Sequence, residues 1–184
     1  MPAPAEEMPD WSTVPLRQLL QHILDKHHPR LREQLRLVGR LMKRVAPLRD
    51  LHIVPLQRVF AHLQSELESH LREEEKFLFP VILRVEAGDP VPKSPFGSIR
   101  HAILMMEHDH EVVMQDLEDI RDITYGYDLG ADAYLNLRAL YTELQALESA
   151  LHTHIQLEND ILFPRSASLE WQGLVLLAAK GATA

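Results

Sequence analysis

Hydrophobic residues recur three or four positions apart along most of the chain, which is the spacing of one face of an α-helix. The first such pattern extends from Leu16 to Met42. Three further patterns of the same kind cover residues 56–85, 99–123 and 131–163. The spacing predicts four long amphipathic helices, each with one face available for burial.

Short segments rich in proline, glycine or polar residues separate these patterns, at residues 46–55, 87–98 and 124–130. Four long helices with short connections favour an antiparallel up-down four-helix bundle, so we predict an all-α fold. The bundle is expected to occupy residues 13–165, after a disordered lead over residues 1–12.

The C-terminal segment, residues 166–184, contains the longest apolar run of the chain, "GLVLLAA". This segment is compatible with a short extra helix packed on the bundle or with a tail that faces a partner. The run is far shorter than the ~20 residues of a membrane-spanning helix. The start, "MPAPAEEMPD", does not resemble a signal peptide, so we expect a soluble, cytoplasmic protein with no membrane partner.

The composition excludes several classes of function. The 184 residues are 46% hydrophobic, which suffices for one domain with a substantial core. The formal net charge is -8 and basic residues do not cluster with aromatic ones, so a nucleic acid is not an expected partner. The absence of cysteine from the sequence excludes disulfides, thiolate metal sites and thiol catalysis in this chain. The 11 histidines are an unusually large number and need an explanation.

One motif occurs twice, once in each half of the chain. "HLREEEKFLFP" begins at His70, and "HTHIQLENDILFP" ends at Pro164. Each copy has a histidine, a glutamate four residues later, and Phe-Pro at the end. The corresponding residues are His70, Glu74, Phe79 and Pro80 in the first copy, and His154, Glu158, Phe163 and Pro164 in the second.

Both His-Glu pairs are predicted to face the core, because each lies on the apolar stripe of its helix. An imidazole or carboxylate among leucines costs on the order of 1–3 kcal/mol if it has no partner. A single pair of this kind is most simply an internal salt bridge. Two copies at matching positions favour a shared metal site instead.

The first and third predicted helices offer further inward histidines. His108 shares a stripe with Met105 and Val112, so we predict that it faces the core. In the first helix, periodicity allows either His27 or His28 to face inward. Histidine and carboxylate ligands without cysteine suit iron, manganese or zinc, and two inward carboxylates among several imidazoles best suit a pair of bridged metals.

These residues carry a resemblance to a known family. The segments "HILDKHHPRLREQL", "SHLREEEKFLFP", "MMEHDHE" and "HIQLENDILFP" resemble the haemerythrin-like HHE domain, and in particular the repair-of-iron-centres (RIC) di-iron proteins. The resemblance extends from about Val14 to Pro164. It implies two non-haem irons joined by an oxygen bridge, although manganese and zinc also fit such ligands. The ligands that it implies are His28, His52, His70, Glu74, His108, His154 and Glu158.

The resemblance separates two kinds of function. Oxygen-carrying haemerythrins have His-x3-His on the third helix, whereas here Val112 lies four residues after His108. The repair proteins restore iron-sulfur or di-iron centres damaged by nitric oxide or oxidants, so damaged iron-sulfur proteins and nitric oxide or dioxygen are the implied partners. These proteins often carry a further domain with a cysteine pair, which this cysteine-free chain does not contain.

The implied ligand set leaves the type of activity open. Five imidazoles and two bridging carboxylates fill nine of about twelve positions on two six-coordinate irons, and an oxygen bridge takes two more. The open position can bind nitric oxide or dioxygen. The primary hypothesis is therefore iron-centre repair or nitric oxide chemistry under nitrosative and oxidative stress, and the alternative is a binding or sensing module without turnover. A ferritin-like oxidase is disfavoured, because that class has Glu-x2-His spacing.

Overall fold

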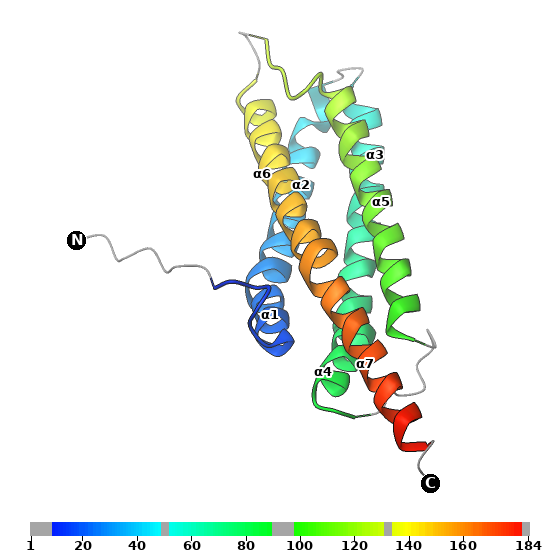
Figure 1. The fold of residues 1–184 in the computed structure, drawn as a ribbon. Coiled ribbons are helices and arrows are strands. Elements are labelled where there is room, and N and C mark those ends of the chain that lie inside the picture. Colours follow the sequence, from blue (N-terminus) through cyan, green and yellow to red (C-terminus); the bar gives the residue numbers. More distant parts are fainter. Residues whose placement is uncertain (1–8, 49–51, 90–97, 131–133, 182–184) are drawn as a thin grey trace, which may run out of the picture.

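The computed structural model describes the chain except for residues 1–8, 49–51, 90–97, 131–133 and 182–184. The described residues contain helices and no strand. Four long helical runs pack side by side, and successive runs point in opposite directions (Figure 1). The prediction of an all-α, antiparallel four-helix bundle is therefore confirmed.

Each of the first two runs consists of two α-helices joined by one turn of π-helix. The first run contains α1 (Leu16–His22), η1 (Ile23–His27) and α2 (His28–Val45), and ends in the 3₁₀ turn η2 (Ala46–Leu48). The second run contains α3 (Ile53–Glu73), η3 (Glu74–Leu78) and α4 (Phe79–Glu86). The third run is the single helix α5 (Ile99–Ile123), and the fourth contains α6 (Leu135–Leu157), η4 (Glu158–Leu162) and α7 (Phe163–Gly181).

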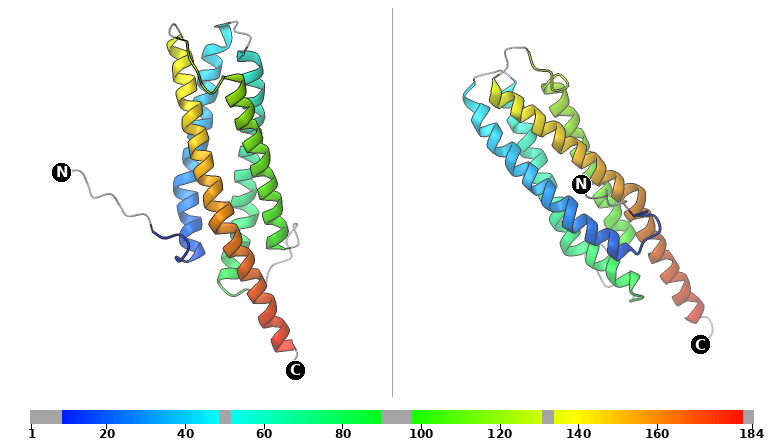
Figure 2. Two further views of the ribbon diagram at one scale, coloured as in Figure 1. Left: turned by 45° about the horizontal axis from the view of Figure 1, so that its top comes forward. Right: turned by 90° about the vertical axis from the view of Figure 1, so that its left-hand side faces the viewer.

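The segment after Pro164 belongs to the fourth run. Helix α7 continues α6 through η4 to Gly181, and its end extends beyond the other helices (Figure 2). The C-terminal segment is therefore helical, but it continues the fourth run rather than forming a separate helix packed on the bundle. The division of the chain into a lead, a domain and a tail stays a prediction. Residues 1–8 of the predicted lead lie outside the described residues, and Asp10 accepts hydrogen bonds from Thr13 in an ordered turn.

Each π turn lies just before a proline in the sequence. In each turn a backbone N–H bonds to the carbonyl five residues earlier: His28 to Ile23, Phe79 to Glu74, and Phe163 to Glu158. The next residue in each case is a proline, whose ring crowds the preceding turn and whose nitrogen has no hydrogen to donate. A wider turn relieves this crowding without ending the helix. Pro80 thus disturbs its helix locally, as its position in the sequence predicts.

Two carboxylates from the second and fourth runs cap the helices of the first and third. Glu86 accepts hydrogen bonds from the backbone N–H groups of Leu16 and Arg17 at the start of α1, at 2.5 and 2.9 Å. Glu170 accepts from Ile99 and Arg100 at the start of α5, at 2.8 and 3.2 Å. Glu86 and Glu170 follow their respective Phe-Pro pairs at the same distance in sequence, so the repeat also fixes how the runs meet.

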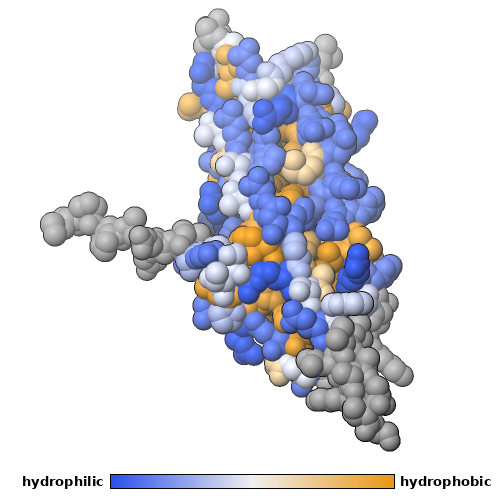
Figure 3. All heavy atoms as spheres, in the orientation of Figure 1, coloured by the Kyte–Doolittle hydropathy of each residue, from blue (hydrophilic) through white to orange (hydrophobic). Residues whose placement is uncertain are grey.

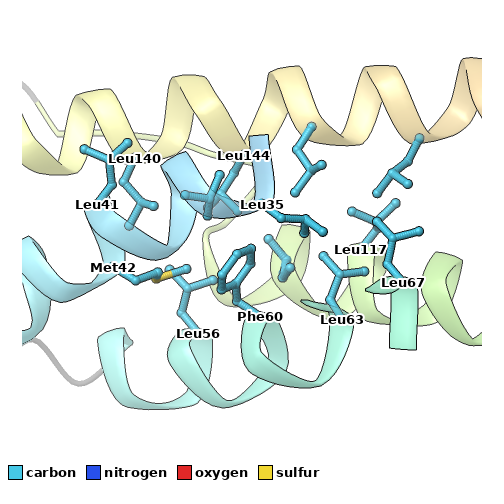
Figure 4. Close-up of a cluster of buried hydrophobic side chains, with 14 of the residues drawn as sticks. Leu35, Leu41, Met42, Leu56, Phe60, Leu63, Leu67, Leu117, Leu140 and Leu144 are labelled. Carbon is cyan, nitrogen blue, oxygen red and sulfur yellow. The ribbon is translucent and has the colours of Figure 1, made fainter. Parts of the chain in front are cut away.

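The core consists of two hydrophobic clusters along the bundle. The larger cluster fills the half nearer the α2–α3 and α5–α6 connections (Figure 4). Its side chains in that view include Leu35, Leu41 and Met42 of α2, Leu56, Phe60, Leu63 and Leu67 of α3, Leu117 of α5, and Leu140 and Leu144 of α6. The second cluster joins α1, α4, the start of α5 and α7.

The surface in the view of Figure 3 is mostly hydrophilic in its upper half, whereas hydrophobic residues gather in the lower half. Exposed apolar side chains include Leu104 and Met105 on α5 and Phe77 on η3. Within the ranges that the structure describes, no helix has the length and apolarity needed to cross a bilayer.

Candidate metal centre

Six polar side chains from all four helical runs meet between the two hydrophobic clusters. They are His28 of α2, His70 of α3, Glu74 of η3, His110 of α5, His154 of α6 and Glu158 of η4. Each is at most 3% exposed. On every run the polar residues lie between a residue of one hydrophobic cluster and a residue of the other, as His28 does between Ile23 and Leu31. They therefore form one polar layer across the core.

The donor atoms of this layer point at one another. Nε2 of His28 and Nε2 of His70 lie 3.4 and 3.5 Å from the same Glu74 oxygen, Oε2. Nε2 of His110 and Nε2 of His154 lie 3.2 and 3.4 Å from Oε2 of Glu158. Two ligands of one ion, each about 2.0–2.2 Å from it, lie about 3–3.5 Å apart. The spacing of the donors therefore fits two adjacent cations.

Most of these atoms have no hydrogen-bond partner among the described residues. Both oxygens of Glu74, both oxygens of Glu158, both nitrogens of His154 and Nε2 of His28 are buried and unsatisfied. Each buried atom without a partner lowers the stability of the fold by about 1–3 kcal/mol. Seven such atoms cost about 7–20 kcal/mol together, which is comparable with the total stability of a domain, roughly 5–15 kcal/mol. Bound cations would pair with both carboxylates, with Nε2 of His28 and with one nitrogen of His154, so the residues present fit a metal. The other nitrogen of His154 has no hydrogen-bond partner among the described residues.

Outer hydrogen bonds hold three of the four imidazoles through their other nitrogen. Oε1 of Glu75 lies 2.7 Å from Nδ1 of His28 and also accepts from Arg32. Oδ1 of Asn159 lies 2.9 Å from Nδ1 of His110. Asp109 lies 3.4 Å from Nδ1 of His70. Such partners favour the proton on Nδ1, which leaves Nε2 free to bind a metal.

The two carboxylates differ in their electrostatic surroundings. Burial would raise the pKa of Glu74, but the imidazoles of His70, His28 and His154 outweigh burial and hold this pKa at about 2. Burial and the neighbouring charge of Glu74 raise the pKa of Glu158 well above its ordinary value. Without a metal, the surroundings therefore favour the charged form of Glu74 and the protonated form of Glu158, and a cation that binds Glu158 competes with its proton.

Two of the four clustered histidines, His154 and His110, are biased toward the neutral form that binds metals. Burial lowers the pKa of His154 well below its ordinary value, and burial also lowers the pKa of His110. His70 differs from these two: burial opposes its protonation, but the charge of Glu74 and the contact with Asp109 raise its pKa. A neutral imidazole with a free Nε2 is ready to act as a ligand.

Five of the seven ligands predicted from the sequence come together here: His28, His70, Glu74, His154 and Glu158. Their role as metal ligands stays a prediction. The choice between His27 and His28, which periodicity leaves open, is resolved for burial, because His28 is fully buried in the cluster. The ring of His27 instead faces His22, with their Nε2 atoms 3.3 Å apart.

The predicted inward orientation of His108 is wrong. Its side chain is 73% exposed and lies 3.6 Å from Glu111, whereas His110 occupies the expected place in the cluster. Sequence reasoning missed His110, although a signal for it exists. Seven buried residues of α5 recur at alternating steps of four and three: Ile99, Ile103, Met106, His110, Val113, Leu117 and Ile120. This stripe is longer than the one through His108 and includes His110.

His52 does not reach the cluster either. It precedes the first residue of α3, and its ring lies 5.2 Å from the ring of Tyr125 in the α5–α6 connection. A helical rise of about 1.5 Å per residue places it roughly 27 Å from His70 along α3. Helix α2 extends from His28 to Val45, and His52 comes after it, so His52 lies near the end of the bundle away from the cluster.

Comparison with known proteins agrees with this geometry. The family model described as the Hemerythrin HHE cation binding domain matches residues 19–166. The iron-sulfur cluster repair protein YtfE of Enterobacter sp. (strain 638) is 35% identical over 165 residues, which cover 88% of this chain and 70% of that protein. The probable iron-sulfur cluster repair protein of Haemophilus influenzae is 32% identical over 159 residues, which cover 85% of this chain and 67% of that protein. The family match includes all six residues of the buried cluster, and this chain belongs to the hemerythrin HHE cation-binding family.

Proposed function

We propose that the buried cluster binds two iron ions and that the protein acts in the repair of iron-sulfur centres damaged by nitric oxide or oxidants. The observation that carries this proposal is the set of unsatisfied histidine and glutamate atoms in a closed layer of the core. Relatives over most of the chain are named iron-sulfur cluster repair proteins, which supports the choice of process.

The ligand set supports a pair of ions rather than one. The two groups of donors share His154 and Glu158, and each group has members of its own. Four imidazoles and two carboxylates, each with two oxygens to offer, would supply eight of about twelve positions on two six-coordinate ions. When bound, an iron pair supplies one-electron redox changes and open positions for a diatomic ligand such as nitric oxide or dioxygen.

The residues of the chain have distinct tasks in this proposal. Glu75 and Asn159 fix the rings of His28 and His110, so that each Nε2 is directed inward. Burial and the charge of Glu74 raise the pKa of Glu158, so in this proposal a cation competes with a proton for this carboxylate. The hydrophobic clusters on both sides exclude water from the layer, which strengthens the interaction between the carboxylates and the cations.

Metal analysis is the first test. The purified protein is expected to hold about two irons per chain, with a near-ultraviolet absorption that a strong chelator removes. A double variant, Glu74→Ala with Glu158→Ala, is expected to lose both irons. One zinc or manganese per chain, without uptake of iron under anaerobic loading, contradicts the iron pair.

A reactivation assay tests the repair activity. A [4Fe–4S] dehydratase is inactivated with nitric oxide, and the recovery of its activity is followed with the iron-loaded protein, with the double variant and with free ferrous iron. We expect faster recovery with the loaded protein than with the other two. Equal recovery in all three, combined with reversible binding of nitric oxide or dioxygen by the loaded protein, supports a binding or sensing module instead.

A further inference from the structure

A cleft of about 750 Å³ opens beside the buried cluster of six histidine and glutamate residues. It lies where the N-terminal segment and η1 approach α6, near the start of the described chain in Figure 1. Its lining comprises Pro9, Trp11, His22, Lys26, His27, Arg30, Leu31, Ser149, Ala150 and Thr153. None of these residues belongs to the six-residue cluster.

The walls of the cleft are held in place by specific contacts. The ring of Trp11 packs on the ring of His22, with centroids 4.4 Å apart. Arg165 donates to the backbone carbonyls of Trp11 and Val14, at 2.6 and 2.5 Å, and thereby fixes the N-terminal segment against α7. The cleft is therefore a formed feature of the fold.

The charged side chains that line the cleft are all cationic or histidine side chains. Lys26 and Arg30 are exposed cations, and Ser149 adds a hydroxyl from α6. The Thr153 hydroxyl, in contrast, donates to the Ser149 carbonyl at 3.0 Å. Among the residues that line the cleft there is no carboxylate. Three acidic residues adjoin the lining in sequence, and each already has a hydrogen-bond donor: Ser12 for Asp10, Gln21 for Asp25, and Arg121 and Tyr127 for Glu148. A concentration of cations and donors is unexpected on a chain whose net charge is -8.

We propose that this cleft binds a small polyanion through carboxylate or phosphate oxygens. Lys26 and Arg30 supply the two positive charges, and the flat, two-pronged guanidinium of Arg30 suits a carboxylate or phosphate group. The volume lies within the range of about 300–1,000 Å³ that is usual for small-molecule sites. The proposal concerns residues outside the metal cluster and does not depend on iron binding or repair.

A cation is a poorer occupant of the same cleft. The Nε2 atoms of His22 and His27 lie 3.3 Å apart, which alone suits two ligands of one metal. However, Lys26 and Arg30 line the same space without a neutralising carboxylate, so a cation meets two positive charges there. The same two charges favour an anion.

The position of the cleft gives the anion a route to influence the metal cluster. The ring of His27 lies 5.8 Å from the ring of His154, centroid to centroid, so only one imidazole separates the cleft from the buried layer. An anion held by Lys26 and Arg30 is thus close to the cluster without being part of it.

Tryptophan fluorescence provides the test. The chain has two tryptophans, and Trp171→Phe leaves Trp11 as the sole reporter at the cleft. The protein as isolated is titrated at constant ionic strength with inorganic phosphate and, separately, with propane-1,2,3-tricarboxylate, while absorption confirms that its metal content is unchanged. We expect a saturable change with at least one of them. Saturation by phosphate alone or by tricarboxylate alone supports the proposal and identifies the class of anion.

The variant Lys26→Gln with Arg30→Gln is expected to weaken this binding at least about tenfold, because two charge-assisted contacts are lost. Both positions are exposed, so the fold should be unaffected. The matched control is Lys43→Gln with Arg44→Gln, the same change of charge near the far end of α2. Equal weakening by both double variants, or no saturable signal with either anion, overturns the proposal.

Discussion

Replacement of Glu158 by leucine should separate the stability of the fold from metal binding. Glu158 lies in the core next to Leu162, and both of its oxygens are buried without a hydrogen-bond partner in the described chain. Burial and the charge of Glu74 raise the pKa of Glu158 well above its ordinary value, so the metal-free fold disfavours the charged form of this side chain. Leucine therefore removes two unsatisfied polar atoms, each worth about 1–3 kcal/mol, while it fills a similar volume. After an allowance for imperfect packing, we expect the free energy of unfolding of the metal-free protein to increase by about 2–4 kcal/mol.

The assay is urea and thermal unfolding of chelator-treated protein. The expected gain raises the midpoint of thermal unfolding by about 5–15 °C for a chain of this size. The same variant should hold less metal than the wild type. The matched control is Glu118→Leu on the exposed face of α5, which should change the free energy of unfolding by less than about 0.5 kcal/mol and leave metal content intact. A metal-free Glu158→Leu protein that is less stable than the metal-free wild type refutes the reasoning.

The same substitution has a pH signature. Because the pKa of Glu158 is raised in the folded chain from an ordinary value of 4.5, the folded state keeps a proton that the unfolded state has released above that pH. The unfolded state binds fewer protons there, so this group's contribution to stability falls as pH rises above about 4.5. The advantage of Glu158→Leu over the wild type should therefore widen between about pH 5 and pH 7. An advantage that shrinks over this range contradicts the raised pKa.

Four further substitutions test the assignment of the ligands. His110→Ala is expected to release at least one metal per chain, whereas His108→Ala leaves metal content unchanged, because only His110 is buried in the cluster. His52→Ala should also retain full metal content, since His52 lies near Tyr125 at the other end of the bundle; loss of metal from this variant disproves the placement. Glu75→Gln should weaken metal affinity about 10–100-fold by loosening His28, and chelator competition measures the change.

The sequence was sufficient for the overall fold because the information lies in a strong periodic signal. Apolar residues at helical spacing mark all four runs, and proline and glycine mark their connections. The doubled His-Glu motif lies on the stripe of its own helix, and so His70, Glu74, His154 and Glu158 all face inward as predicted. The inward orientation of each of these residues can be predicted from the periodicity of its own helix alone.

The errors arose where two stripes compete or where a contact is remote. On α5, His108 and His110 lie two residues apart and each belongs to an apolar stripe, so the choice depends on how many members of each stripe are buried. Met105, on the stripe of His108, is 40% exposed, whereas Met106, on that of His110, is 1% exposed. The tertiary packing against α3 and α7 decides between the stripes. Likewise, the position of His52 depends on where α2 ends, which composition does not specify.

The π turns explain why the two halves of the chain do not match on their first helices. The path from Leu16 to His28 is one residue longer than the path from Ile99 to His110, although Leu16 and Ile99 are both capped by a glutamate at equivalent positions. A π turn accommodates one inserted residue in an α-helix, and η1 lies on the longer path while α5 has no such turn. The insertion therefore lets His28 and His110 reach the same layer from paths of unequal length.

The two halves also differ in the partners of their first-helix histidines. Glu75 and Asn159 each follow the inward glutamate of the repeat, and each holds the Nδ1 atom of a buried imidazole of the cluster, His28 or His110. A carboxylate accepts a stronger hydrogen bond from an imidazole than an amide does, which makes the metal-binding nitrogen more basic. The two copies of the repeat therefore place a hydrogen-bond acceptor at the same position. The acceptor is a charged carboxylate in the first copy and a neutral amide in the second. His28 should bind its metal more tightly than His110, and the two positions of a symmetric scaffold need not be equivalent.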